Sequence, residues 1–271
     1  MFSRVELVAD VADDGTPVLA RIHARGQFAV RATGPGVVHL VGTAAGPLGG
    51  DVLEVSVRVR AGARLTVRGV AATLALPGRE GGQAESGTDL VVDDGAVLDY
   101  ALPPLVICRA ARLRTTTRLL LQGSAVADVA EQVVLGRHGQ AGGDWTGRMV
   151  ADRDGRPVLR STQRSDLLQA APTPAGITQV RALVTHLHAQ PATQPATQPT
   201  TRPANQPLTR PAPQGPAGWI GTAVACPLTG GGVLITAIAA DLSTALADAT
   251  AAGMITTASP HPLVTEESIH T

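Results

Sequence analysis

The sequence predicts a mainly β protein: a layered or helical-coil β body of successive hairpins, with one or two α-helices near the C-terminus. From Val5 to about Gln163, apolar and polar residues alternate in short runs that Gly, Asp-Gly and Pro interrupt. This pattern is typical of strands joined by tight turns. Within this region a unit of strand, polar turn and strand recurs. Its turn glycines are Gly62, Gly95 and Gly123.

The run "VLEVSVRVR" (residues 52–60) shows the alternation most clearly, with Leu53 and Val55 on one side and Glu54 on the other. Such a strand has one buried and one solvated face. Residues 176–188 have mixed periodicity and indicate either a helix or a strand. Further on, "GWIGTAVACP" and "GGVLITAIAA" predict two strands. Residues 241–253 predict a helix, because an acidic N-cap precedes an Ala/Leu-rich interior and a closing Gly.

The segment "QPATQPATQPTTRPANQPLTRPAP" (residues 190–213) has proline at every fourth position. Each proline removes a backbone donor and disfavours the α region at the preceding residue, so we expect a disordered, polyproline-like tether. An inert insertion is favoured over a partner-recognition motif, which stays the alternative. The predicted organisation is a β-rich body over 1–188, this insertion over 189–216, C-terminal strands and a helix packing on the same body over 217–258, and a tail over 259–271.

Composition excludes several classes of function. The chain has 22 basic and 22 acidic residues and no net charge, so nucleic acid and anionic membranes are not expected partners. It has no lysine, which excludes Lys-dependent phosphate loops, Schiff-base catalysis and attachment of pyridoxal phosphate. Two widely spaced cysteines, Cys108 and Cys226, together with a start unlike a signal peptide and no apolar run of about 20 residues, predict a cytoplasmic protein with free thiols and no membrane span.

Common catalytic and cofactor motifs do not occur: there is no G-x-S-x-G, H-E-x-x-H, C-x-x-C or G-x-G-x-x-G. The stretch "GPLGGD" (residues 46–51) is a Gly-rich corner that places Asp51 before a strand. His186 and His188 lie two residues apart and on a strand would share a face, as metal ligands can. Because they border the Pro-rich segment, solvated loop histidines are the favoured interpretation.

Two further groups of charged residues have structural interpretations. Asp93 and Asp94 precede Gly95, so a role in the turn is favoured over an acid pair for glycoside cleavage. A basic series alternates along a predicted strand, which is typical of a solvated face, with an acidic partner surface as the second interpretation. Its members are Arg109, Arg112, Arg114 and Arg118.

Glu131 differs from the other acids because its parity matches Val129 and Val133 in an apolar strand and predicts an inward position. An inward carboxylate needs a cation, a donor or a water-filled cavity. Arg137 has the same parity and is a possible partner. A structural ion pair and a metal-conducting acid are both open at this point.

Taken together, these residues resemble the UreD family of urease accessory proteins, called UreH in some organisms. The similarity runs through "GPLGGDVLEVSVRVRAGARLTVRGVAAT", "LDYALPPLVICRAARLRTTTRLLL" and "AEQVVLGRHG", and covers about residues 4–165, with a looser match over 219–253. The chain departs from the family pattern at Leu74, near Cys108, in the spacing from Arg137 to Asp144 and in the Pro-rich insertion. These departures concern partner contacts more than membership.

The resemblance implies a non-enzymatic scaffold that acts with UreF, the GTPase UreG and apo-urease, and passes nickel through an internal water-filled tunnel. It implies Asp51, Glu131 and His138 as stations for nickel in transit, with no tightly bound cofactor. Two alternatives remain: a β-rich hydrolase with Asp51 and Glu131 as its acid pair, and a purely structural adaptor in which Glu131 is paired with Arg137.

Overall fold

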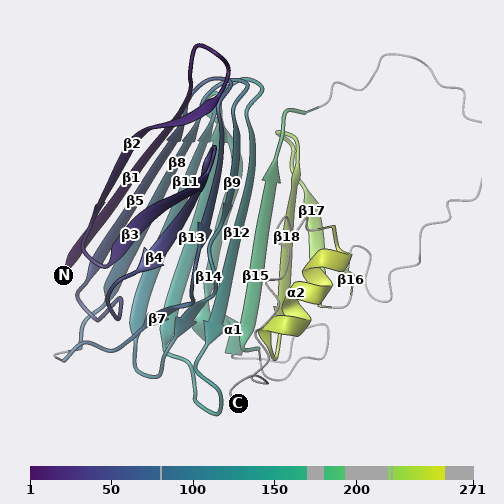
Figure 1. The fold of residues 1–271 in the computed structure, drawn as a ribbon. Coiled ribbons are helices and arrows are strands. Elements are labelled where there is room, and N and C mark those ends of the chain that lie inside the picture. Colours follow the sequence, from purple (N-terminus) through teal and green to yellow (C-terminus); the bar gives the residue numbers. More distant parts are fainter. Residues whose placement is uncertain (80, 170–179, 193–218, 221, 254–271) are drawn as a thin grey trace, which may run out of the picture.

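The computed structural model of the protein describes residues 1–79, 81–169, 180–192, 219–220 and 222–253. Over these residues the chain forms two large β-sheets and two α-helices (Figure 1). The prediction of a mainly β, layered body with a helix near the C-terminus is confirmed. In the described residues, no helix is long and apolar enough to cross a membrane.

The smaller sheet, sheet A, has seven strands. In spatial order they are β14 (Arg156–Arg164), β13 (Asp144–Arg153), β11 (Arg112–Leu121), β8 (Ala84–Val92), β5 (Val52–Val59), β1 (Phe2–Val11) and β2 (Pro17–Arg25). The inner strands pair in parallel, and the two edge strands pair antiparallel to their neighbours.

The larger sheet, sheet B, has eleven strands. Nine follow the order β16 (Trp219–Ile220), β17 (Ala223–Pro227), β18 (Val233–Ala239), β15 (Ala182–Ala189), β12 (Val126–Leu135), β9 (Val97–Ala101), β6 (Arg64–Gly69), β4 (Val37–Gly42) and β3 (Phe28–Gly34). The short strand β10 (Leu105–Ile107) pairs with β12 and with β7 (Thr73–Ala75). The helices are α1 (Ser165–Gln169) and α2 (Leu242–Ala251).

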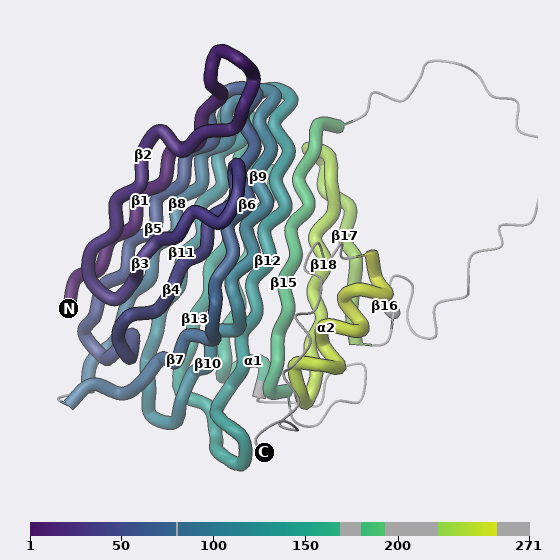
Figure 2. The backbone as a smooth tube through the Cα atoms, viewed as in Figure 1, coloured from purple at the N-terminus to yellow at the C-terminus, as the bar shows by residue number. Residues whose placement is uncertain are grey.

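Between β4 and β13 the chain winds from one sheet to the other as a coil of parallel strands (Figure 2). Strands β5, β8 and β11 lie side by side in sheet A, while the strands that follow them, β6, β9 and β12, lie side by side in sheet B. The helical-coil form of the prediction is therefore the one found. The hairpins expected at the three Gly turns are absent, because the strands flanking each turn join different sheets.

The turn glycines allow this stacking. Gly62, Gly95 and Gly123 have φ of +72°, +68° and +49°, a region that glycine enters without steric cost. Asp94 Oδ1 accepts hydrogen bonds from the backbone N and the hydroxyl of Ser124, both at 2.7 Å, and so ties one turn to the next. The predicted turn role of Asp94 is confirmed.

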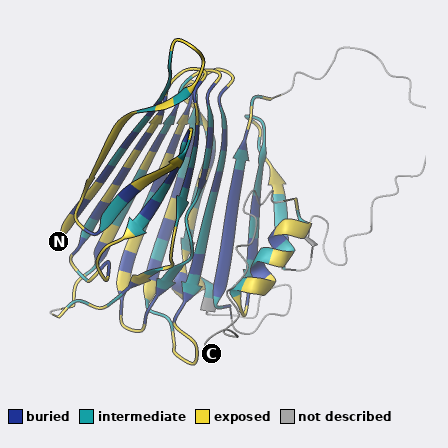
Figure 3. Cartoon of the chain, viewed as in Figure 1, coloured by how far each residue is buried: buried dark blue, intermediate teal, exposed yellow. Residues whose placement is uncertain are grey.

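The main core lies between the sheets and consists mainly of aliphatic side chains from the inward positions of both. A second face is buried where α2 packs on the outside of β15, β17 and β18. Strand β15 is therefore covered on both sides, and almost all of its residues are buried (Figure 3). Of the segment 176–188, predicted as a helix or a strand, residues 182–188 belong to this strand, and 176–179 lie outside the described residues. A strand buried on both faces does not alternate, which explains the mixed periodicity of its described part.

The first predicted C-terminal strand, residues 218–227, contains two strands, β16 and β17, which pair antiparallel, so the prediction of a single strand there is wrong. The second predicted strand is β18 and the predicted helix is α2. Strand β18 is hydrogen-bonded to β15 over residues 233–239, so segments on either side of the Pro-rich stretch meet in one sheet. Most of the predicted insertion (193–216) and the predicted tail (259–271) lie outside the described residues.

Candidate functional site

A cavity of about 120 Å³ lies between the inner faces of the two sheets. Well-packed protein interiors rarely leave voids much larger than a water molecule, and this space is large enough to hold water. Its walls are mainly apolar, but polar side chains reach it from both sheets. The polar lining consists of Thr73, Ser86, Thr88, Tyr100, Thr115, Thr117, Glu131 and Gln132.

Four hydroxyls form a patch on the sheet A wall. Ser86 and Thr88 occupy consecutive inward positions of β8, and their register neighbours on β11 are Thr115 and Thr117. Trp145 Nε1 donates to Thr115 Oγ1 at 3.1 Å, which fixes one of these side chains. The patch gives the cavity a wall of oxygen atoms that can face water or a cation.

Glu131 reaches the same cavity from β12 in sheet B. Its predicted inward position is confirmed, since Val129 and Val133 on the same face of the strand are buried. The Thr117 hydroxyl donates to Glu131 Oε1 at 2.5 Å. Burial raises the pKa of the Glu131 carboxyl, and the hydrogen bond from Thr117 offsets only part of that effect. Burial in the folded protein therefore favours the protonated form of Glu131.

Arg137 is not the partner of Glu131. Strand β12 ends at Leu135, and Gly136 follows with φ +83°, so the alternation that gave the two residues the same parity stops before Arg137 is reached. The Arg137 side chain is exposed, and its carbonyl accepts from Arg181 Nη2 at 2.6 Å. The donor that Glu131 uses is a hydroxyl of the other sheet.

Tyr100 adds a phenol to the sheet B wall. Its side chain is 4% exposed, and its hydroxyl makes no well-formed hydrogen bond to the described residues. Burial raises its pKa strongly, while the nearby Thr88 hydroxyl lowers it slightly. The Tyr100 hydroxyl therefore stays protonated and is free to donate to, or accept from, an occupant of the cavity.

Asp51 lies one inward-facing position before Leu53, which lines the cavity, but Asp51 is not itself part of the lining. It is 5% exposed. Its Oδ2 accepts from the backbone N of Leu48 at 2.9 Å, and its Oδ1 pairs with the ammonium of Met1. Gln27 Oε1 is also buried nearby without a protein partner in the described residues. Asp51 thus caps the corner beside the cavity.

The glycines of "GPLGGD" shape that corner. A Cβ on Gly49 would lie within 3.0 Å of backbone atoms of Gly78, Gly81 and Gly82, so only glycine lets these two loops touch. Gly50 has φ +90°, which favours glycine again. The corner holds Pro47 against the cavity and fixes the direction in which β5 begins.

His138 lies in the turn after β12 and is exposed. It does not line the cavity, and the structure does not bring it together with Asp51 or Glu131. Among the three residues expected to act as stations, only Glu131 reaches the cavity. No hydrogen bond joins Asp51 and Glu131, so the described geometry gives no support to an acid pair for hydrolysis.

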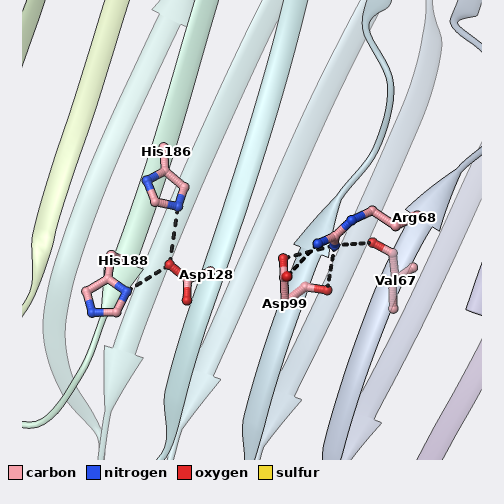
Figure 4. Close-up of polar contacts among 6 residues, drawn as sticks. All are labelled: Val67, Arg68, Asp99, Asp128, His186 and His188. Atoms are coloured by element: carbon pink, nitrogen blue, oxygen red, sulfur yellow. Dashed lines mark hydrogen bonds and ion pairs between the residues drawn. The ribbon is translucent and has the colours of Figure 1, made fainter. Parts of the chain in front are cut away.

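His186 and His188 are not solvated loop residues, and that interpretation is wrong. Both lie on β15, and His186 is only 2% exposed. Both rings face Asp128 Oδ1 on β12: His188 Nδ1 at 2.8 Å and His186 Nε2 at 3.3 Å (Figure 4). The Pro-rich stretch begins only after the end of this strand, so the histidines keep strand geometry.

The cluster behaves as a buried polar network. Burial raises the pKa of Asp128, but the hydrogen bonds from His186 and His188 outweigh it and lower the pKa below its usual value. A second polar contact lies further along sheet B, where Asp99 is on β9, next to β12, and Arg68 is on β6, next to β9. Arg68 Nη1 and Nη2 donate to the Asp99 carboxylate at 2.9 and 2.5 Å (Figure 4). Within the described part of the chain, no three His, Cys, Asp or Glu residues are arranged to hold a metal ion.

Sequence reasoning missed the hydroxyl wall. The signal was present, because Ser86 and Thr88 have the inward parity of Leu90, and Thr115 and Thr117 have that of Leu119. Small hydroxyls at inward positions indicate a polar interior only when two such strands are neighbours. Their adjacency depends on the coiled topology, which the sequence pattern alone did not reveal.

The comparisons with known proteins agree on one family. A family model described as UreD urease accessory protein matches residues 3–262. The chain is 35% identical over 247 residues to "Urease accessory protein UreD 1" of Saccharopolyspora erythraea, covering 89% of each chain. It is 38% identical over 242 residues to "Urease accessory protein UreD 3" of Streptomyces griseus subsp. griseus, covering 84% of this chain and 86% of the relative. Over 149 residues it is 42% identical to the UreD of Streptomyces coelicolor, covering 54% and 59%.

Proposed function

The chain belongs to the UreD family of urease accessory proteins, and from this premise we propose that it is a non-enzymatic scaffold that passes nickel through the cavity between its sheets to apo-urease. In this role it acts with UreF and the GTPase UreG. The observation that carries the proposal is a carboxylate, Glu131, that shares one cavity with a wall of hydroxyls in an otherwise aliphatic interior.

The donor set suits a divalent cation in transit. Carboxylate, hydroxyl and water oxygens bind nickel without the thiolates that would hold it tightly. Because burial favours protonated Glu131, an arriving cation must displace a proton, and this competition weakens binding. Weak binding is what transfer requires, since each station must also release its ion.

Thr117 has a positioning role in this scheme. Its hydroxyl donates to Glu131 Oε1 and holds the carboxylate toward the hydroxyl wall. Tyr100 supplies an uncharged hydroxyl opposite this wall. Asp51 is proposed to act at the Pro47 corner, two positions before the lining residue Leu53. His138 is proposed to act at the surface beyond the end of β12.

The proposed setting is the cytoplasm. Both cysteines are unpaired, with Cys108 buried and Cys226 exposed, as is usual where thiols stay reduced. No bound cofactor is proposed: nickel is the cargo.

The test is co-expression of the chain with apo-urease, UreF and UreG, followed by measurement of nickel per urease active site. We expect Glu131→Ala and Glu131→Gln to co-purify with the partners yet to lower nickel loading and urease activity about tenfold or more. Thr117→Val should lower it less. Glu54→Ala, an exposed acid on the outer face of β5, is the matched control and should load normally.

Sensitivity to Glu131→Gln separates nickel passage from a structural adaptor. The amide keeps the size and the hydrogen-bond acceptor of the carboxylate but binds a cation poorly. Full nickel loading with Glu131→Gln would refute the proposed path while leaving membership in the family untouched.

A further inference from the structure

The outer face of sheet A concentrates arginines near its β14 edge. The register places Arg114, Thr146 and Arg164 in one row across β11, β13 and β14; the next row is Thr116, Arg148 and Thr162; the third is Arg118, Val150 and Arg160. All nine residues have the outward parity of their strands, and all five arginines are exposed. The arginine face is defined as Arg114, Arg118, Arg148, Arg160 and Arg164.

The arrangement is compact. Arg148 occupies the centre of the nine positions and the other four arginines occupy the corners. With strands about 4.8 Å apart and about 3.3 Å per residue along each strand, every corner Cα lies roughly 8 Å from that of Arg148. This is about one Debye length at physiological salt, so the charge of Arg148 lies within electrostatic range of each of the other four positions. The four residues between them are uncharged.

The positive charges are only partly neutralised within the chain. Arg118 pairs with Asp89 at 3.1 Å, Arg160 with Asp152 at 2.5 Å and Arg164 with Asp166 at 2.5 Å. Arg160 also donates to the carbonyls of Ala151 and Leu159, which hold it along its own strand edge. Arg114 and Arg148 have no hydrogen bond or ion pair to any described residue and present free guanidinium groups to solvent.

We propose that the arginine face docks an acidic protein surface. Guanidinium groups bind carboxylates through two parallel hydrogen bonds and lose less hydration than ammonium groups do, which suits a protein interface. The residues at positions 116, 146 and 162 are threonines, which are short and uncharged, and Arg114 and Arg148 beside them are exposed. Leu120, one row beyond Arg118 and 49% exposed, offers an apolar contact at the margin.

The border of the face favours a protein over a nucleic acid. Glu85 and Asp89 lie beside it on β8, Asp144 and Asp152 flank it along β13, and the chain as a whole is neutral. A phosphate backbone extending past the five arginines would meet these acids, whereas a carboxylate cluster of matching size would not. The docking surface is on the outside of sheet A, away from the cavity, and does not depend on nickel passage.

The test uses the full chain and a fluorescently labelled oligoglutamate peptide, with binding followed by anisotropy at low and at physiological salt. We expect the double variant Arg114→Gln/Arg148→Gln to bind about tenfold more weakly than the wild type. Arg25→Gln/Arg64→Gln, which removes two exposed arginines outside the face, should stay within about twofold. Thermal melting of both double variants should match the wild type, because neither removes a contact.

Three results would overturn the proposal. One is absence of measurable oligoglutamate binding by the wild type at low salt. Another is an equal loss of oligoglutamate affinity in the two double variants, which would show that the peptide responds to overall charge and not to the arginine face. The third is tighter binding of a DNA duplex of equal charge that is lost in Arg114→Gln/Arg148→Gln, which would reassign the face to nucleic acid.

Discussion

At Glu131, the environment opposes the ordinary chemistry of the side chain. It carries an ionisable group into an aliphatic interior, with one hydroxyl as its hydrogen-bond donor. The folded state therefore holds a proton on Glu131 more tightly than the unfolded chain does. Stability favours an uncharged side chain at this position, whereas the proposed nickel passage needs a carboxylate there.

The pH dependence of stability follows from that pKa. Because the pKa of Glu131 is raised above 4.5 in the folded state, its penalty is absent at pH below 4.5 and grows as the pH rises toward the folded pKa. We expect Glu131→Gln to match the wild type near pH 4.5 and to be more stable than the wild type at neutral pH, because the amide carries no charge to desolvate. Melting temperatures across this range check it; a gap that narrows as pH rises would contradict it.

The pKa of Asp128 shifts in the opposite direction to that of Glu131. Its pKa is lowered below 3.8 by hydrogen bonds from His186 and His188, despite the opposing effect of burial. Its contribution to stability is therefore present above pH 3.8 and is lost as the pH falls through the folded pKa. We expect Asp128→Asn to cost about 1 kcal/mol at neutral pH. Asp13→Asn, an exposed acid without side-chain contacts in the described residues, is the control for urea unfolding.

If Asp13→Asn and Asp128→Asn lost the same stability, the two histidines would not be holding the carboxylate.

The Asp128 network also shows a limit of sequence reasoning. The two histidines share a strand face, as their spacing predicts, but their partner comes from β12, about 60 positions earlier in the chain. Proximity to a Pro-rich segment said nothing about burial.

At the scale of elements, α2 closes the outer side of β15 and β18. Asp241 is its N-cap: the side chain accepts from the backbone N of Thr244 at 2.9 Å and from the hydroxyls of Ser243 and Thr244. These bonds lower the pKa of Asp241 to about 2. The helix and this cap were predictable because the signals are local in sequence.

We expect Asp241→Ala to destabilise α2 by about 1 kcal/mol and Asp241→Asn to retain most of the cap. Hydrogen exchange of the α2 amides is the measurement, since Ala245 and Ala249 pack on the sheet only while the helix is formed. Equal exchange in the alanine variant and the wild type would show that packing alone holds the helix.

Strands were predictable for the same local reason, and their pairing was not. Alternation fixes which side chains of β8 and β11 point inward, but the glycine turns allow a hairpin or a crossing to the other sheet. Register across the coil is a property of strands some 30 positions apart. This is why Glu131 could be identified as an inward acid while the hydroxyl of Thr117 could not be identified as its donor.

At the scale of the whole molecule, the coil separates two surfaces with different chemistry. The inner faces of the sheets enclose the cavity, and the outer face of sheet A carries the arginine face. A scaffold can therefore bind a partner on one surface without disturbing a path for ions in its interior. The central claim is that nickel uses the cavity itself.

Filling the cavity tests this claim most directly. Ser86→Leu adds bulk to the hydroxyl wall, and Ser56→Leu makes the same change on the outer face of β5. Overpacking is expected to cost about 1–3 kcal/mol, so the melting temperature and co-purification of each variant are measured alongside nickel per urease active site. We predict that Ser86→Leu assembles with its partners but delivers several-fold less nickel, while Ser56→Leu delivers the normal amount. Normal nickel loading by an assembled Ser86→Leu protein would contradict passage through this cavity.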